Sequence, residues 1–183
     1  MKGKLIVISA PSGAGKTTVI RRLLSKNPDL VLSVSCTTRK KRPSENDGID
    51  YIYVSGEEFD GLKAGGDLLE HASVHGFYYG TPKRPIDGWL EQARTVVLDV
   101  DVQGGAAIKK QYPEACLIFI SPPSMRELRR RITSRGENSA DDIAVRMKNA
   151  EEEMKNASDY DFVVINSDIE KAVLEIERII CSV

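Results

Sequence analysis

The chain has 183 residues, enough for one domain with a full hydrophobic core or for a core domain with small inserted lobes, and we expect a single folded unit. A formal net charge of -1 and a pI near 6.2 argue against general binding to nucleic acid or to a membrane surface, although basic residues can still cluster locally. Any anion site must therefore be built by local geometry.

Apolar, β-branched runs predict the strands of a buried parallel sheet, since an edge strand would alternate apolar and polar residues. The first run, Lys4 to Ser9, leads directly into a helix from about Gly15 to Ser25. Further strands are expected at 30–35, 95–100, 115–120 and 161–165, mostly separated by helical patterns, with a final helix over 169–180. This alternation predicts a doubly wound α/β fold.

Two sections interrupt the alternation. Residues 36 to about 84 are rich in Gly, Tyr and charge, which predicts a small mixed lobe. Residues 124 to about 157 are highly charged and helical, with a break near Arg135 and a capping candidate at Ser139, which predicts a mobile helical hairpin. The core would then comprise about 1–35, 85–123 and 158–183.

The sequence predicts neither a signal peptide nor a disulfide framework. The apolar run before Pro11 is too short for the core of a signal peptide, and no segment approaches membrane-spanning length, so we expect a cytoplasmic protein. Cys36, Cys116 and Cys181 are widely spaced, which predicts reduced thiols that are buried or partly buried. The sequence indicates no obligate protein partner.

The stretch "SAPSGAGKTT" between the first strand and helix predicts a phosphate-binding loop. It meets the pattern G-x-x-x-x-G-K-[ST] at Gly15, Lys16 and Thr17, but Ala10 stands where the first Gly is usual. Backbone N–H groups at a helix N-terminus would surround an anion, and Lys16 would bridge the terminal phosphates. The predicted ATP-binding residues in this loop are Ala10, Pro11, Ser12, Gly13, Ala14, Gly15, Lys16, Thr17 and Thr18.

A magnesium ion bound with ATP is the expected cofactor. The Thr17 hydroxyl would ligate Mg²⁺, and Asp99, at the end of the strand in "VVLDVDV", would act as a second-sphere carboxylate. Taken alone, an Asp at a strand end is more often a cap or turn residue. The pair His71 and His75 has no evident third ligand, so we do not expect zinc.

The phosphate acceptor has to be identified from the inserted lobes. Arg39 and Arg42 lie near Tyr51 in sequence, and Tyr79 follows, so two guanidinium forks and two phenolic hydroxyls could hold a phosphate dianion. Tyr53, by contrast, is expected simply to pack in the lobe.

Two further residues of this lobe suit a guanine base. Glu70 could accept from the adjacent N1–H and N2 amine of guanine, and Ser35 could donate to O6. Adenine would oppose a lone pair at N1 to this carboxylate. The residues therefore favour GMP over AMP as the acceptor.

Six stretches together resemble the guanylate kinase family, over essentially the whole chain. They are "SAPSGAGKTT", "SVSCTTRKKRPSENDGIDY", "EHASVHGFYYGTP", "VVLDVDVQG", "LRRRITSRG" and "VVIN". The resemblance implies a three-layer P-loop NTPase fold with a GMP-binding lobe and a helical lid. It also implies the transfer of the γ-phosphoryl group of ATP to GMP, and to dGMP.

Several residue roles follow from the resemblance alone. It implies contacts to the guanine base from Ser35, Glu70 and Asp101, contacts to the GMP phosphate from Arg39, Arg42, Tyr51 and Tyr79, and a place in the acceptor pocket for Thr81. It implies lid arginines Arg131, Arg135 and Arg146 at the transferring phosphate, and Asn166 near the adenine. Departures from the family pattern are Ala10, Lys40-Lys41 between the paired arginines, and Ser167 where Asp is usual.

Two rival functions keep the same fold. A guanylate-kinase-like binding module would use it as a protein-interaction surface, but the intact phosphate loop and arginines argue against that. A kinase for another phosphorylated acceptor is disfavoured by Glu70, Ser35 and Asp101. We expect Arg129 and Arg130 to face solvent rather than substrate.

Overall fold

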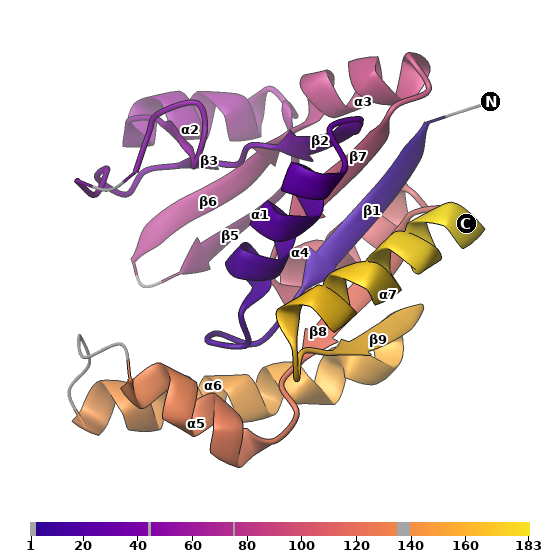
Figure 1. Cartoon of the computed structure of the whole chain (residues 1–183). Helices are drawn as coiled ribbons and strands as arrows, with labels where there is room; N and C mark the ends of the chain where they lie inside the picture. Colours follow the sequence, from indigo (N-terminus) through magenta and orange to yellow (C-terminus); the bar gives the residue numbers. More distant parts are fainter. Residues whose placement is uncertain (1–2, 44, 75, 135–139) are drawn as a thin grey trace.

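The core is a five-stranded parallel sheet in the order β2-β7-β1-β8-β9, flanked by helices (Figure 1). The computed structural model describes residues 3–43, 45–74, 76–134 and 140–183. The core elements are β1 (Lys4–Ser9), α1 (Lys16–Lys26), β2 (Leu30–Ser33), α3 (Lys83–Glu91), β7 (Thr95–Asp99), α4 (Val102–Gln111), β8 (Cys116–Ser121), β9 (Phe162–Ile165) and α7 (Ile169–Ser182). The predicted α/β class and parallel sheet are confirmed.

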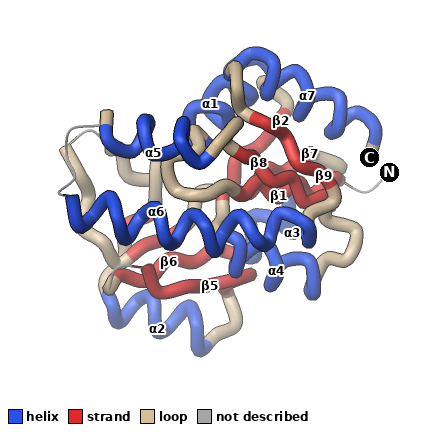
Figure 2. Tube along the Cα trace, turned by 90° about the horizontal axis from the view of Figure 1, so that it is seen from below, coloured by secondary structure: helices blue, strands red, loops and turns tan. Residues whose placement is uncertain are grey.

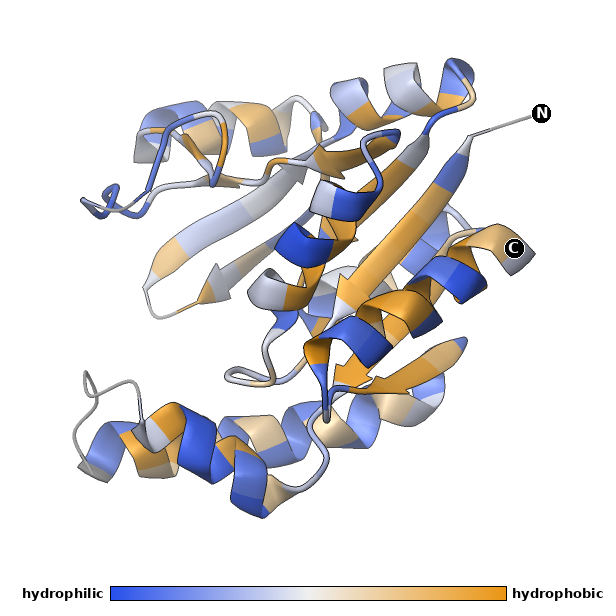
Figure 3. Ribbon diagram, viewed as in Figure 1, coloured by the Kyte–Doolittle hydropathy of each residue, from blue (hydrophilic) through white to orange (hydrophobic). Residues whose placement is uncertain are grey.

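Each face of the sheet is covered by its own helices, as the period-two alternation of side chains requires. Ile6 and Ile8 of β1 point to the side covered by α1 and α7, whereas Leu5 and Val7 point to the side covered by α3 and α4. All the residues of β8 are buried. Figure 3 shows the core strands as largely apolar bands. The result is a three-layer core.

A second, mixed sheet forms a small lobe that extends from the core. It has the order β4-β3-β6-β5, and its elements are β3 (Cys36–Thr37), β4 (Ile52–Tyr53), α2 (Gly56–Ala64), β5 (Leu68–Val74) and β6 (Phe77–Pro82). The strands β3 and β4 are short, because their pairing with each other is limited to two residues. These elements fall within the range 36–84.

Two helices pack against each other at the bottom of Figure 1, and Figure 2 shows them side by side: α5 (Met125–Thr133) and α6 (Ala140–Lys155), followed by the short 3₁₀ helix η1 (Asn156–Asp159). Ser124 caps α5 by accepting from the Glu127 N–H. The predicted break at Arg135 and cap at Ser139 lie outside the described residues. The division of the chain into core, lobe and lid stays a prediction.

No helix of the described residues is long and apolar enough to cross a membrane. All three cysteines are free, and Cys36 and Cys116 are buried. The expectation of burial is wrong for Cys181, which is exposed because it lies on the solvent-facing side of α7 together with Leu174 and Arg178.

Candidate active site

The loop between β1 and α1 has the backbone geometry of an anion-binding turn. Gly13 and Gly15 adopt φ values of 91° and 96°, in the left-handed region that favours glycine, and Gly15 caps the N-terminus of α1. Ala10 is 6% exposed and packs in the main core cluster, so an alanine is accommodated where the motif usually has its first glycine. The loop therefore presents a helix N-terminus at the carboxyl end of β1.

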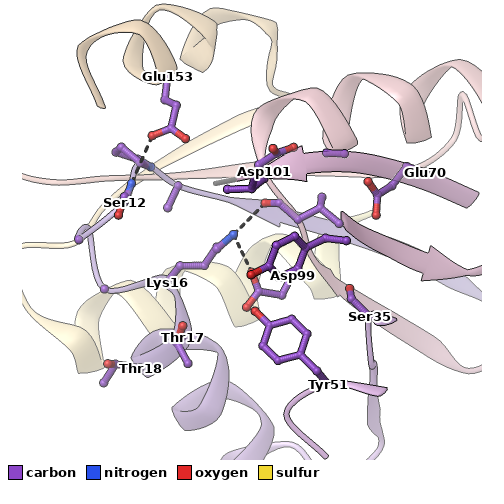
Figure 4. A pocket seen from close by; sticks show the side chains of 18 residues that line it. Ser12, Lys16, Thr17, Thr18, Ser35, Tyr51, Glu70, Asp99, Asp101 and Glu153 are labelled. Atoms are coloured by element: carbon purple, nitrogen blue, oxygen red, sulfur yellow. Dashed lines mark hydrogen bonds and ion pairs between the residues drawn. The ribbon is translucent and has the colours of Figure 1, made fainter. Parts of the chain in front are cut away.

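Lys16 is turned toward the end of β7 rather than over its own loop. Its Nζ lies 2.6 Å from Asp99 Oδ1 and donates to the Val100 carbonyl at 2.8 Å (Figure 4). Asp99 ends β7 next to β1, as the sequence predicted. The Lys16 ammonium and the Asp99 carboxylate therefore neutralise each other's charge.

A single cavity of about 390 Å³ joins the phosphate loop to the small lobe. Such a volume is typical of a small-molecule site, and it lies where β7 and β8 flank β1, at the switch point of the sheet. Its walls include Ala10, Pro11, Ser12, Gly13, Gly15, Lys16, Thr17, Thr18, Ser35, Tyr51, Glu70, Tyr79, Asp99, Asp101 and Glu153. Most of the predicted site residues are thus brought together.

Glu70 forms the lobe end of this cavity. Its Oε1 accepts from Thr81 Oγ1 at 2.5 Å, and Thr81 Oγ1 lies 3.4 Å from Ser35 Oγ. A Cβ placed on Gly104 would lie 3.1 Å from Glu70 Oε2, so glycine at this point of α4 leaves room for the carboxylate. Burial, and secondarily the charge of Asp101, raise the Glu70 pKa above its ordinary value.

Asp101 has a structural role as well as a place in the cavity wall. It caps α4, with Oδ1 accepting from the Gly104 N–H at 2.8 Å. The other carboxylate oxygen is left for the cavity, where Figure 4 shows Asp101 between Lys16 and Glu70.

The aromatic residues of the lobe surround Arg39. Its Nε donates to Tyr79 Oη at 3.2 Å, and its Cζ lies 5.4 Å from the centre of the Tyr51 ring. Arg42 is exposed, and its backbone N–H donates to Glu45. Tyr53 was expected only to pack, but its hydroxyl donates to Glu45 at 2.7 Å, so it joins this polar cluster.

Arg131, one of the predicted lid arginines, contacts the phosphate loop but does not line the cavity. Arg131 Nη1 donates to the Ala14 carbonyl at 3.2 Å, and Nη2 donates to the Asn166 carbonyl at 3.0 Å. Arg146 is half-buried on α6. Arg135 lies outside the described residues. Arg129 and Arg130 are exposed, as predicted.

Asn166 also holds the phosphate loop. The residue is 2% exposed, and its Nδ2 donates to the Ala14 carbonyl at 2.7 Å. Its Oδ1 is buried without a hydrogen-bond partner among the described residues. The Asn166 side chain therefore fixes the turn that leads into α1.

Glu153 was missed by the sequence interpretation. Its Oε2 accepts from the Ser12 N–H at 3.3 Å, so a carboxylate of α6 touches the phosphate loop (Figure 4). Burial raises the Glu153 pKa. The only sequence signal is helical spacing, because Glu153 follows the fully buried Ala150 by three residues and so shares its face.

The residues present fit a magnesium ion that arrives with a nucleotide. The described residues contain no group of three or more His, Cys, Asp or Glu that could hold a metal alone. Mg²⁺ in such sites is usually held by one or two protein oxygens together with phosphates and water. The Thr17 hydroxyl and the Asp99 carboxylate line the same cavity and could supply those oxygens.

Comparisons with known proteins agree along the whole chain. Residues 2–183 match the family model described as guanylate kinase. The guanylate kinase of Thermosynechococcus vestitus is 46% identical over 98% of this chain and 94% of its own length. That of Caldanaerobacter subterraneus is 48% identical over 98% and 87%. The crystal structure of guanylate kinase from Anaplasma phagocytophilum superposes with a TM-score of 0.83 at 35% identity, over 99% of this chain and 86% of that one.

Proposed function

This chain belongs to the guanylate kinase family, and we propose that it transfers the γ-phosphoryl group of ATP to GMP, and to dGMP, with the acceptor held in the small lobe and the donor on the phosphate loop. The observation that carries the assignment of the two sites is the shared cavity, since Glu70 and Ser35 line one end and Lys16 lines the other. A kinase needs both substrates in one closed space.

The base of GMP is read by Glu70 in this proposal. Its carboxylate accepts from guanine N1–H and N2–H. Each ionised oxygen can accept more than one hydrogen bond, so Oε1 can also keep the bond from the Thr81 hydroxyl. Ser35 donates to O6, and Asp101 offers the oxygen that does not cap α4. The phosphate of GMP lies against Arg39, Arg42, Tyr51 and Tyr79.

The donor phosphates lie on the loop from Ala10 to Thr18. Binding requires Lys16 to leave Asp99, which the modest burial of the pair permits, since their side chains are 21% and 33% exposed. Magnesium, when bound with ATP, supplies positive charge that stabilises the transferring phosphoryl group. Thr17 and Asp99 are the residues that would hold it.

Little covalent chemistry is required of the chain. The attacking phosphate oxygen of GMP is already ionised, so the protein has to align two anions, neutralise their repulsion and exclude water. Arg131, Arg135 and Arg146 supply that charge from the lid in this proposal. Arg131 would have to leave the Ala14 and Asn166 carbonyls, or act through the loop that it holds. The proposal also assigns Asn166, whose side chain holds the Ala14 carbonyl of the loop, to the adenine end of the donor site.

The test is a coupled ADP-release assay of the purified chain with ATP, Mg²⁺ and GMP, dGMP, AMP, CMP or UMP as acceptor. Turnover should be high with GMP, measurable with dGMP and low with the other three. A chain that bound nucleotides without turnover would instead support a binding module. Comparable turnover with AMP and GMP would contradict the role given to Glu70.

A further inference from the structure

Glu45 lies at the centre of the acceptor-phosphate cluster, although its side chain is only 14% exposed and does not line the cavity. Its Oε1 accepts from Arg39 Nη2 at 2.8 Å. Its Oε2 accepts from Arg39 Nη1 at 3.0 Å, from the Arg42 backbone N–H at 2.8 Å and from Tyr53 Oη at 2.7 Å. One carboxylate therefore joins both arginines expected at the GMP phosphate.

The hydrogen bonds of Arg39 show which of its guanidinium N–H donors is free to bind a ligand. Besides the two bonds to Glu45, Nη1 donates to the Lys40 carbonyl at 2.8 Å and Nε donates to Tyr79 Oη. A guanidinium has five N–H donors, and these four bonds leave a single Nη2 N–H without a partner among the described residues. Both Nη atoms of Arg39 thus donate to Glu45, and the guanidinium packs against the rings of Tyr51 and Tyr53.

We propose that Glu45 is a positioning residue that orients the acceptor phosphate by fixing Arg39 and the Arg42 backbone before GMP binds. This inference rests on the proposed function. Arg39 then contacts the phosphate with one N–H in a fixed direction. The exposed side chain of Arg42 binds the same phosphate, and its backbone is already held by Glu45. Preorganisation of this kind lowers the ordering cost of binding and aligns the attacking oxygen.

The geometry favours orientation over simple charge neutralisation. Glu45 is shared by a guanidinium, a backbone N–H and a phenol, which come from three points of the lobe, and charge-assisted bonds of this number hold direction as well as charge. The hydrogen bonds of Arg39 hold the Glu45 pKa at about 2, so the carboxylate stays ionised throughout the assay range.

The first variant is Glu45→Gln, assayed for GMP, ATP and guanosine. The amide keeps one accepting oxygen but replaces the other by an NH2 donor, so it cannot accept from both Arg39 nitrogens, the Arg42 N–H and the Tyr53 hydroxyl together, and Arg39 is held less firmly. We expect the KM for GMP to rise roughly tenfold or more and kcat to fall, while the KM for ATP changes less than about twofold. The inhibition constant of guanosine, which lacks the phosphate, should also stay within about twofold of the wild-type value.

Two further variants separate positioning from stability. Glu58→Gln removes the same charge from the same lobe and weakens the capping box of α2, in which Glu58 accepts from the Ser55 N–H, so it serves as the matched control and should leave the GMP constants unchanged. Glu45→Asp keeps the carboxylate on a shorter chain and should restore part of the GMP affinity.

Each outcome decides the inference. Equal losses for guanosine and GMP would show that Glu45 only stabilises the lobe, and tighter GMP binding in Glu45→Gln would show that it opposes the phosphate; both overturn the proposal, as do unchanged GMP constants. Wild-type turnover with GMP is measured first. Failure there refutes the proposed function, whereas an active wild type with an unaffected Glu45→Gln refutes only the role of Glu45.

Discussion

Replacing Glu70 by Gln tests base recognition and the cost of keeping that carboxylate buried. Glu70→Gln keeps the size of the side chain and can still accept from Thr81, but it places an amide donor against a guanine donor in a closed pocket. Leaving such groups unpaired costs about 1 to 3 kcal/mol, so kcat/KM for GMP should fall roughly ten- to a hundredfold.

Steady-state kinetics on two acceptors measure the effect. AMP presents an acceptor at N1 and a donor at N6, so its kcat/KM should fall less or rise, and the GMP to AMP ratio should narrow. The KM for ATP should barely change, because Glu70 lies at the opposite end of the cavity from the phosphate loop. An unchanged GMP to AMP ratio would refute the assignment of Glu70 to the base.

Glu70→Gln should lower the activity with GMP but raise the stability of the folded protein at neutral pH. Burial raises the Glu70 pKa above its ordinary value of 4.5. A carboxyl with a raised pKa favours the folded state while protonated, and this contribution is lost as the pH rises through the raised pKa. Glu70→Gln cannot ionise, so the ligand-free variant should melt at a higher temperature than the wild type at pH 7 to 8. The difference should vanish near pH 4. A lower melting temperature at every pH would contradict the inferred cost of burial.

Three further substitutions address the phosphate groups. Lys16→Met should abolish transfer and leave the circular dichroism spectrum unchanged, because Lys16 makes polar contacts and does not pack in the core; near-normal turnover would refute the assignment of the phosphate loop. Arg42→Met should raise the KM for GMP and lower kcat together in steady-state kinetics, and an effect confined to ATP would assign Arg42 to the donor side. Arg146→Met should lower kcat with little change in the Kd of GMP measured by calorimetry, and a comparable loss of GMP binding would contradict its role in the lid.

The sequence predicted best the elements that short-range pattern controls. Strands such as β1 and β8 are continuous apolar runs, and a buried parallel strand has no other simple pattern. The phosphate loop is equally local, since its glycine conformations, its lysine and its helix N-terminus fall within a few residues. The two-residue strand β3 has no such signal, because it depends on pairing with distant segments of the chain.

The contacts of charged residues were harder to predict, since charge alone does not specify a partner. Glu45 and Glu153 each lie in a charged run in which any residue could face solvent, and only the folded chain selects them. Arg131 was assigned to the transferring phosphate through the family resemblance, yet here it donates to the Ala14 carbonyl of the loop. Whether it turns toward a nucleotide stays a prediction.

The pairing of charges explains how a nearly neutral chain can hold two anionic nucleotides. Lys16 faces Asp99 and Arg39 faces Glu45, so neither cation is left half-buried and unpaired. The two pairs differ in burial, because the side chains of Arg39 and Glu45 are 12% and 14% exposed, less than those of Lys16 and Asp99. The more exposed pair is the weaker one, so we expect Lys16 to exchange Asp99 for a donor phosphate, while Arg39 keeps Glu45. The donor side is then rearranged by its ligand, and the acceptor side is formed before GMP arrives.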